Sequence, residues 1–199
     1  MGKQIRSIEV TDAQAVCDIY APFVSDSATS FEAIAPDTSE MERRIGEITP
    51  KHPWLVFEGD SSVLGYAYAC THRTRHAYQW SADVSVYIHE GARNRRVGQA
   101  LYTALFHLLR RQGYFNAYAG ITLPNPASVR LHESLGFSRI GVYTRTGFKF
   151  GKWHDVLWLQ LRLSEESGSP HDPRSTEGLF QDERILAFLH KCAKSVKFD

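Results

Sequence analysis

A basic turn that contains a glycine is the part of this sequence best suited to chemistry. It reads Arg95-Arg96-Val97-Gly98-Gln99-Ala100, follows Arg93, and opens a predicted helix over Val97–Gln112. The first N–H groups of a helix have no partner within it and carry partial positive charge, which suits a pyrophosphate. Gly98 would let the backbone approach the phosphate closely, and the small Ala100 would keep the next turn clear. The pattern alone also fits an exposed basic turn, but its position between a strand and a helix favours phosphate binding.

Two further arginines, Arg73 and Arg75, lie on a short predicted loop just ahead of Tyr78. A guanidinium can hold a carboxylate or a phosphinate through two parallel hydrogen bonds. The pair therefore favours an anionic small molecule as ligand. The alternative is that both arginines are solvated charges of a loop.

The elements that position these residues follow from the spacing of apolar side chains. Alternation with period two predicts strands, and stripes with a period near 3.6 predict helices. Helices are predicted after N-caps at Thr11 and Ser39, over 97–112, and after Asn125. Strands are predicted at 6–10, 54–58, 63–70, 78–88, 117–121, 137–143 and 154–161.

This order predicts an α+β (mixed α/β) domain over residues 1–163, with an antiparallel start and a β-α-β-α-β second half. Residues 164–178 are rich in Ser, Gly, Pro and charge, which predicts a linker. Residues 179–199 predict a helical tail with one apolar face. Either this tail docks on its own subunit or its twin, or it is a helix for a dedicated partner.

Composition narrows the class of protein. The 199 residues carry a net charge of +1, which gives no reason to expect nucleic acid or a membrane as partner. The three cysteines, Cys17, Cys70 and Cys192, are widely spaced. Such spacing predicts reduced thiols in a cytoplasmic protein and argues against a disulfide framework or a zinc site. We therefore expect no metal cofactor.

The basic turn resembles motif A of the GNAT acetyltransferases, and the resemblance extends over residues 4–162. It is similar to the phosphinothricin and methionine sulfoximine N-acetyltransferase branch in these blocks: Ala77-Tyr78-Gln79-Trp80, Val86-Tyr87-Ile88, Leu101-Tyr102, Leu123-Pro124-Asn125, Ser128-Val129-Arg130-Leu131-His132-Glu133, Leu135-Gly136-Phe137, Gly147-Phe148-Lys149 and Trp153-His154-Asp155-Val156. The resemblance implies a GNAT fold, with a strongly bent central mixed sheet of about six to seven strands and about four flanking helices. The C-terminal helix is an extension outside that pattern.

The resemblance also implies acetyl-CoA as co-substrate and assigns residues to it. In this family the strand before motif A carries a bulge whose free backbone groups hold the pantetheine arm, and the matching residues are Val86, Tyr87 and Ile88. Asn125 and Ser128 match positions near the thiol end, although Asn125 is also a plain helix cap. The pyrophosphate would be held by Arg93, Arg95, Arg96, Val97, Gly98, Gln99 and Ala100.

Two residues are candidates for proton transfer. An ammonium must lose a proton before it attacks a thioester, so a carboxylate or imidazole must take that proton. The branch has a Glu as proposed base on the strand before motif A, where this sequence has Asp83. The shorter side chain would need a bridging water, or it would serve only as a structural hydrogen-bond or ion-pair partner. His132 matches the position of a thiolate-protonating Tyr in many GNATs, and its alternative is a packed structural histidine.

The acceptor pocket is implied by the same resemblance. Arg75, three residues before Tyr78, matches an Arg that lines the substrate site, and Phe31 and Glu32 lie on the loop that covers the acceptor. With Arg73 these residues predict a small amino-acid-like acceptor, acetylated on its α-amine by direct transfer in a ternary complex. Acetylation of another amine, or a non-catalytic acyl-CoA-binding module, remains the alternative. The resemblance implies a homodimer.

Overall fold

The computed structural model describes residues 2–165 and 169–197. A seven-stranded mixed sheet has the order β1-β2-β3-β4-β5-β7-β6. Its strands are β1 (Lys3–Ser7), β2 (Trp54–Gly59), β3 (Ser62–Thr71), β4 (Ser81–Ile88), β5 (Asn116–Thr122), β6 (Ser138–Lys149) and β7 (Lys152–Arg162). The helices are α1 (Ala13–Ser25), α2 (Thr38–Ile48), α3 (Val97–Gln112), α4 (Pro126–Ser134) and α5 (Glu183–Lys194), with 3₁₀ turns η1 (Val10–Asp12), η2 (His76–Tyr78), η3 (Glu90–Ala92) and η4 (Leu179–Gln181).

The predicted fold class is confirmed, and the errors lie at element boundaries. The first strand lies about three residues earlier than predicted, and β4 begins at Ser81 because the residues before it form η2. The N-caps predicted at Thr11 and Ser39 are wrong as well. Helix α2 is capped by Asp37, whose side chain accepts from the N–H of Glu40, and α1 follows directly on η1. No helix in the described part of the chain is long and apolar enough to cross a membrane.

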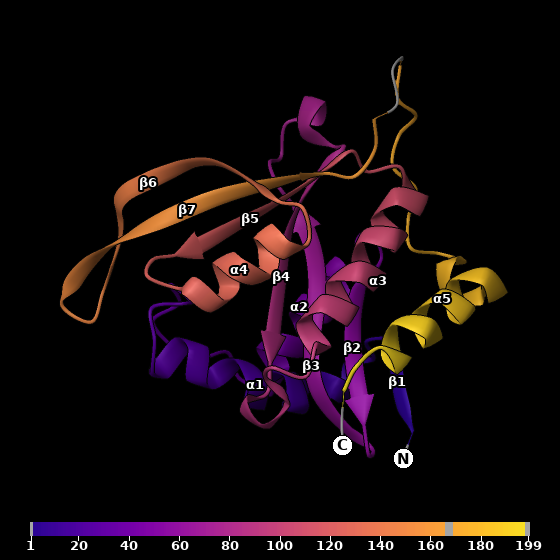
Figure 1. The fold of residues 1–199 in the computed structure, drawn as a ribbon, viewed down its shortest axis with the longest axis horizontal. Helices are drawn as coiled ribbons and strands as arrows, with labels where there is room; N and C mark the ends of the chain where they lie inside the picture. Colours follow the sequence, from indigo (N-terminus) through magenta and orange to yellow (C-terminus); the bar gives the residue numbers. More distant parts are fainter. Residues whose placement is uncertain (1, 166–168, 198–199) are drawn as a thin grey trace.

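Two apolar cores lie on opposite faces of the sheet. Helices α3 and α5 cover one face, and α1 and α2 cover the other (Figure 1). Strand β2 contributes to both, since Leu55 and Phe57 belong to the α3 core and Trp54 and Val56 to the α1 core. A strand covered on both faces has no solvent side, so β2 is apolar at consecutive positions.

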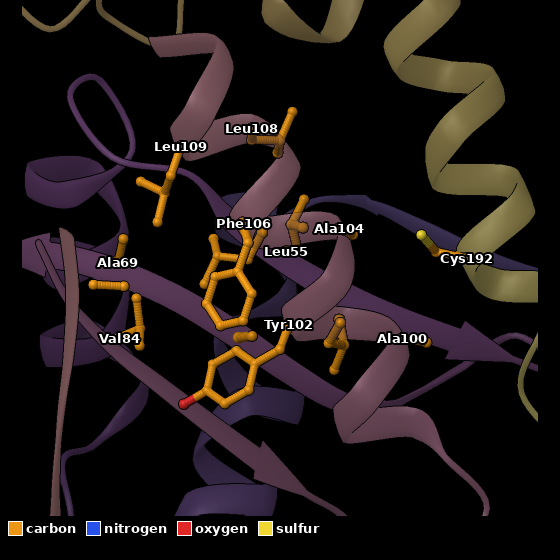
Figure 2. Packing of buried hydrophobic residues seen from close by; sticks show 14 of the residues in the cluster. Leu55, Ala69, Val84, Ala100, Tyr102, Ala104, Phe106, Leu108, Leu109 and Cys192 are labelled. Carbon is orange, nitrogen blue, oxygen red and sulfur yellow. The ribbon is translucent and has the colours of Figure 1, made fainter. Parts of the chain in front are cut away.

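Helix α3 is the centre of the larger core. Leu101, Leu105 and Leu108 are fully buried. Cys192 approaches this core from α5 (Figure 2). The helix ends at Gly113, which adopts a left-handed φ of 96° that glycine tolerates without strain. This rigid packing fixes where the first turn of α3 lies relative to β4.

The sheet opens between its two central strands. Strands β4 and β5 are parallel and pair only over Ser81–Asp83 and Asn116–Tyr118. Beyond that point β4 stays paired with β3 as far as Ile88, while β5 stays paired with β7 as far as Thr122. Two strands that follow different neighbours must diverge, and a gap forms in the middle of the sheet.

The bulge expected at Val86, Tyr87 and Ile88 is absent from the pairing with β3, which is regular from Gly65 opposite Ile88 to Thr71 opposite Ala82. That expectation was wrong for this edge of β4. Instead, the backbone of these residues is not paired with β5 on the other edge of β4, because β5 has already diverged.

The C-terminal helix α5 packs on its own chain. Its buried residues Ile185, Leu189, Cys192 and Ala193 belong to the same core as α3, and the helix lies against β1. After the helix, the N–H of Lys197 donates to the carbonyl of Arg95 at 3.0 Å. The tail therefore reaches the basic turn. The predicted domain limits at 163 and 178 stay predictions.

We expect Leu189→Ala to lower the free energy of unfolding by about 2–4 kcal/mol, because it leaves a cavity between α5 and α3. Leu186→Ala, on the same helix but 46% exposed, should change it by less than about 0.5 kcal/mol. Urea denaturation of both variants measures the difference. Equal small effects would show that α5 is not part of the cooperative core.

Candidate active site

A cavity of about 60 Å³ lies in the gap between β4 and β5. Side chains alternate along a strand, so neighbouring residues lie on opposite faces of the sheet. Both faces contribute here, since Val84 and Val86 face the α3 core while Ser85 and Tyr87 face the other side. The cavity is therefore lined from both faces of the sheet. It is lined by Thr29, Val84, Ser85, Val86, Tyr87, Tyr102, Ala119, Gly120, Ile121, Thr122, Asn125, Ser128 and His132.

On the α3 face, His132 and Tyr102 form a buried pair. The Tyr102 hydroxyl lies 3.1 Å from Nε2 of His132, and it points out of the apolar cluster (Figure 2). Nδ1 of His132 lies 2.8 Å from the carbonyl oxygen of Ser128, which can only accept. Nδ1 therefore carries the hydrogen, and the Tyr102 hydroxyl donates to Nε2. Burial lowers the pKa of His132 and raises that of Tyr102, so both are uncharged at neutral pH.

Asn125 and Ser128 are placed as predicted, at the start of α4. The Asn125 side chain accepts from the N–H of Ser128 at 3.1 Å, so it does cap the helix. Both residues also line the cavity beside His132. The cap thus holds one wall of the cavity in place.

The basic turn lies at the entrance to α3. Arg93, Arg95 and Arg96 are exposed, and the first intrahelical bond runs from the N–H of Ala100 to the carbonyl of Arg96. Arg96 occupies the N-cap position with a φ of 68° and does not cap the helix with its side chain. The N–H groups of the first turn before Ala100 therefore have no acceptor within the helix, as an anion site requires.

Gly98 has a packing role that the sequence did not indicate. It is buried, and a Cβ at this position would lie 3.2 Å from Cδ2 of Leu131 on α4. The same atom would lie 3.8 Å from Cγ1 of Ile88. The glycine lets α3 and α4 approach each other beside the end of β4.

On the opposite face, Asp83 is hydrogen bonded to a histidine. Its Oδ1 lies 2.6 Å from Nδ1 of His72, the residue directly after β3. The two meet because Cys70 is opposite Asp83 in the β3–β4 register. Burial raises the pKa of Asp83, and the hydrogen bond from His72 and the charge of Arg73 oppose that rise. His72 was missed by the sequence analysis, since only this cross-strand register brings it to Asp83.

The predicted acceptor loop is exposed. Arg73 donates from Nη1 to the carbonyl of His72, Arg75 lies at the start of η2, and Tyr78 is 45% exposed. Neither these arginines nor Asp83 line the cavity itself. A second residue missed by the sequence is Trp158 on β7, whose Nε1 is buried without a hydrogen-bond partner. An N–H of this kind is costly unless something accepts from it.

Phe31 and Glu32 lie on the loop between α1 and α2. The Phe31 ring lies directly over Gly147, where any Cβ would lie 2.3 Å from it. The Glu32 carboxylate accepts from Arg44 at 2.8 Å and from the Tyr20 hydroxyl at 2.9 Å. These contacts lower the pKa of Glu32, so the carboxylate is ionised and holds the loop.

The cysteines are not arranged as nucleophiles. Cys17, Cys70 and Cys192 are free, and burial raises the pKa of all three thiols, that of Cys70 to about 12. A thiol with such a pKa is almost never a thiolate at neutral pH. Among the described residues, no group of three or more His, Cys, Asp or Glu side chains could hold a metal ion.

Comparisons with known proteins agree with this architecture. The sequence matches the acetyltransferase (GNAT) domain over residues 5–158. A phosphinothricin N-acetyltransferase of Streptomyces viridochromogenes is 36% identical over 157 residues, which cover 79% of this chain and 86% of that protein. The L-methionine sulfoximine/L-methionine sulfone acetyltransferase of Salmonella typhimurium is 32% identical, over 82% of this chain and 96% of that protein. A crystal structure of a GNAT superfamily phosphinothricin acetyltransferase from Sinorhizobium meliloti, in complex with AcCoA, aligns with a TM-score of 0.80 at 31% identity and covers 92% of this chain and 98% of that one.

Glu32→Gln should lower the free energy of unfolding at pH 7 by about 1 kcal/mol, since it weakens a charge-assisted contact that is one-third exposed. Because the folded-state pKa of Glu32 is lowered, this stabilisation is present above its unfolded pKa and is lost as pH falls through the folded one. The difference between the two proteins should therefore disappear in acid. Urea denaturation at several pH values, with the exposed Glu47→Gln as control, measures it. A pH-independent difference would contradict the assignment.

Proposed function

This chain belongs to the GNAT acetyltransferase family, and we propose that it acetylates the α-amine of a small amino-acid-like acceptor of the phosphinothricin or methionine sulfoximine type. It is an acetyl-CoA-dependent N-acetyltransferase. The observation that carries the proposal is the cavity between β4 and β5, which is lined from both faces of the sheet and is where a thioester and an amine would meet.

Acetyl-CoA fits the residues on the α3 side of the cavity. The first turn of α3 offers N–H groups beside Arg93, Arg95 and Arg96, which suits the pyrophosphate. The gap edge of Val86, Tyr87 and Ile88 offers backbone groups that β5 does not pair, which suits an amide-containing arm. Val97, Gln99 and Ala100 complete the turn, with Gly98 keeping α4 close.

The other face suits the acceptor. Arg75 and Arg73 supply positive charge for a carboxylate or phosphinate, and the unpartnered Nε1 of Trp158 supplies a hydrogen-bond donor. Tyr78 and Phe31 supply apolar walls on the two loops that border this face. Glu32 is proposed to hold its loop rather than to touch the acceptor, since Arg44 and Tyr20 occupy its carboxylate.

Direct transfer is the mechanism that the side chains support. The amine loses a proton on the Asp83 side and attacks the acetyl carbon, and the C–S bond breaks toward the α3 face. There Tyr102 and His132 lie at the cavity wall. The Tyr102 hydroxyl would stabilise the departing sulfur by turning its hydrogen from Nε2 of His132 to the sulfur. A covalent enzyme intermediate is disfavoured by the raised thiol pKa of Cys70.

We expect thiol release from acetyl-CoA with phosphinothricin and methionine sulfoximine, and little with polyamines or aminoglycosides. Arg75→Ala should raise the acceptor KM about 10- to 100-fold with a small change in kcat, because it removes a charged hydrogen-bond donor. Arg139→Ala, an exposed arginine paired with Glu133, is the control and should leave both unchanged. Turnover of cationic amines alone would reject the proposed acceptor class.

A homodimer is proposed from the β6–β7 hairpin, which extends beyond the body of the molecule (Figure 1). Its exposed large apolar residues are Ile140, Val142, Tyr143, Phe148 and Trp153, with Phe150 in the turn. Soluble monomers rarely expose so many large apolar side chains in one element, so a second copy of the chain is the occupant we propose.

Val142→Lys should shift the protein from dimer to monomer at micromolar concentration, because it places a charge in the proposed apolar interface. Val10→Lys, at an equally exposed position on η1, should have no effect. Light scattering coupled to size-exclusion chromatography distinguishes the two masses. A wild-type monomer would refute the dimer.

A further inference from the structure

We propose that His72 is the general base of the reaction and that Asp83 positions it. This inference rests on the proposed function and changes its central assignment, since the proton passes to the imidazole and not to the carboxylate. The observation behind it is the short hydrogen bond between Nδ1 of His72 and Oδ1 of Asp83, at 2.6 Å.

The His72 ring is held on several sides. It stacks on Tyr118, with centroids 4.3 Å apart and planes 15° apart. The ring centroids of Tyr78 and Trp158 lie 6.1 and 6.3 Å from its own, both in T-shaped arrangements. The side chain is only 12% exposed. A ring fixed in this way has little freedom left, as a residue that must meet an amine in one orientation requires.

The hydrogen bond also selects the tautomer. An ionised carboxylate can only accept, so Nδ1 of His72 carries the hydrogen and Nε2 keeps its lone pair. No residue in the described parts of the chain hydrogen bonds to Nε2. The dyad therefore presents one basic nitrogen, and the negative charge of Asp83 stabilises the imidazolium that forms when that nitrogen takes a proton.

The position of the dyad fits this role. The pairing between β4 and β5 ends at Asp83 and Tyr118. Two residues further along these strands, on the same face, Ser85 and Gly120 line the cavity. Two residues of a strand span roughly 7 Å, so the dyad lies at the edge of the gap on the acceptor side. Asp83 alone would have to reach that gap with the shorter of the two acidic side chains.

The reaction balances with this pair. The acceptor ammonium gives one proton to Nε2 of His72, which passes it to solvent. The amine nitrogen forms a bond to the acetyl carbon, and the C–S bond breaks with its electron pair on sulfur. A second proton from the same nitrogen neutralises the thiolate. The products are the N-acetyl compound, CoA thiol and one released proton.

The test compares kcat/KM of wild type, His72→Phe, His72→Gln and Asp83→Asn across pH, with whichever amine wild type acetylates. Without a base, only acceptor that is already unprotonated reacts. The loss in His72→Phe and His72→Gln should therefore be about 100-fold near pH 7 and shrink as pH approaches the pKa of the amine. The loss of kcat/KM in Asp83→Asn, which allows the wrong tautomer, should vary less steeply with pH. His76→Phe, on the same loop and facing solvent, should match wild type.

The groups around His72 that could affect this profile are Asp83 on β4, Cys70 on β3, Tyr118 on β5, Tyr78 on η2 and Arg73 beside it. A loss that is the same at every pH indicates a structural role and overturns the proposal. So does a wild-type rate in His72→Gln combined with inactivity in Asp83→Asn, which would make Asp83 the base.

A measurement without turnover separates this inference from the proposed function. Nitrogen NMR of the His72 imidazole should find Nδ1 protonated and Nε2 unprotonated in the neutral ring. That result supports the dyad even if every tested acceptor fails, in which case only the acceptor assignment falls. The opposite tautomer overturns the dyad whatever the acceptor is.

Discussion

The divergence of β4 from β5 is the constraint on which the site depends. Buried backbone groups need hydrogen-bond partners, and a sheet normally supplies them from the next strand. Here β4 remains with β3 and β5 remains with β7, so the three pairs between Ser81–Asp83 and Asn116–Tyr118 end abruptly. The strands are held apart by separate, complete ladders on their outer sides. The gap is therefore a stable feature of the sheet, and a bound molecule with amide groups can restore the missing bonds.

The gap also divides the chemistry between two environments. On the α3 face, His132 and Tyr102 bond to each other in an apolar setting that keeps both uncharged. On the other face, Asp83 is bonded to His72, and this hydrogen bond and the charge of Arg73 offset part of the cost of burying the Asp83 charge. Proton uptake needs a group that can become charged, and stabilisation of a departing sulfur needs a donor that stays protonated. In the proposed reaction the two faces would meet these opposite requirements, because the sheet lies between them.

The sequence was informative where structure is local. The α3 stripe, the basic turn, the Asn125 cap and the C-terminal helix all depend on residues within a few positions of one another, and they lie close to where they were predicted. The errors come from long-range register and from competing caps. Asp37 outcompetes Ser39 because its carboxylate reaches the N–H of Glu40. His72 could not be paired with Asp83 from the sequence, because their contact requires the exact alignment of two strands that no local pattern specifies. Nor does the sequence indicate that the Glu32 carboxylate accepts a hydrogen bond from Arg44 of the next helix.

Residue 83 is Asp where the resemblance to the family implies a Glu, and the β3–β4 register gives this difference a physical meaning. An aspartate is one methylene shorter, so its carboxylate remains close to the strand and reaches less far into the gap. The imidazole of His72 is bonded to that carboxylate and stacked on Tyr118. In the proposed reaction it would extend the acid–base function by the width of a ring. The raised pKa of Asp83 reflects the cost of burying its charge, and the hydrogen bond from His72 offsets part of that cost. A carboxylate placed this way is suited to orienting a base, since its Oδ1 is bonded to Nδ1 of His72. In the proposed mechanism the same reaction would use a proton acceptor at the end of β3, with the β4 carboxylate as its positioning partner.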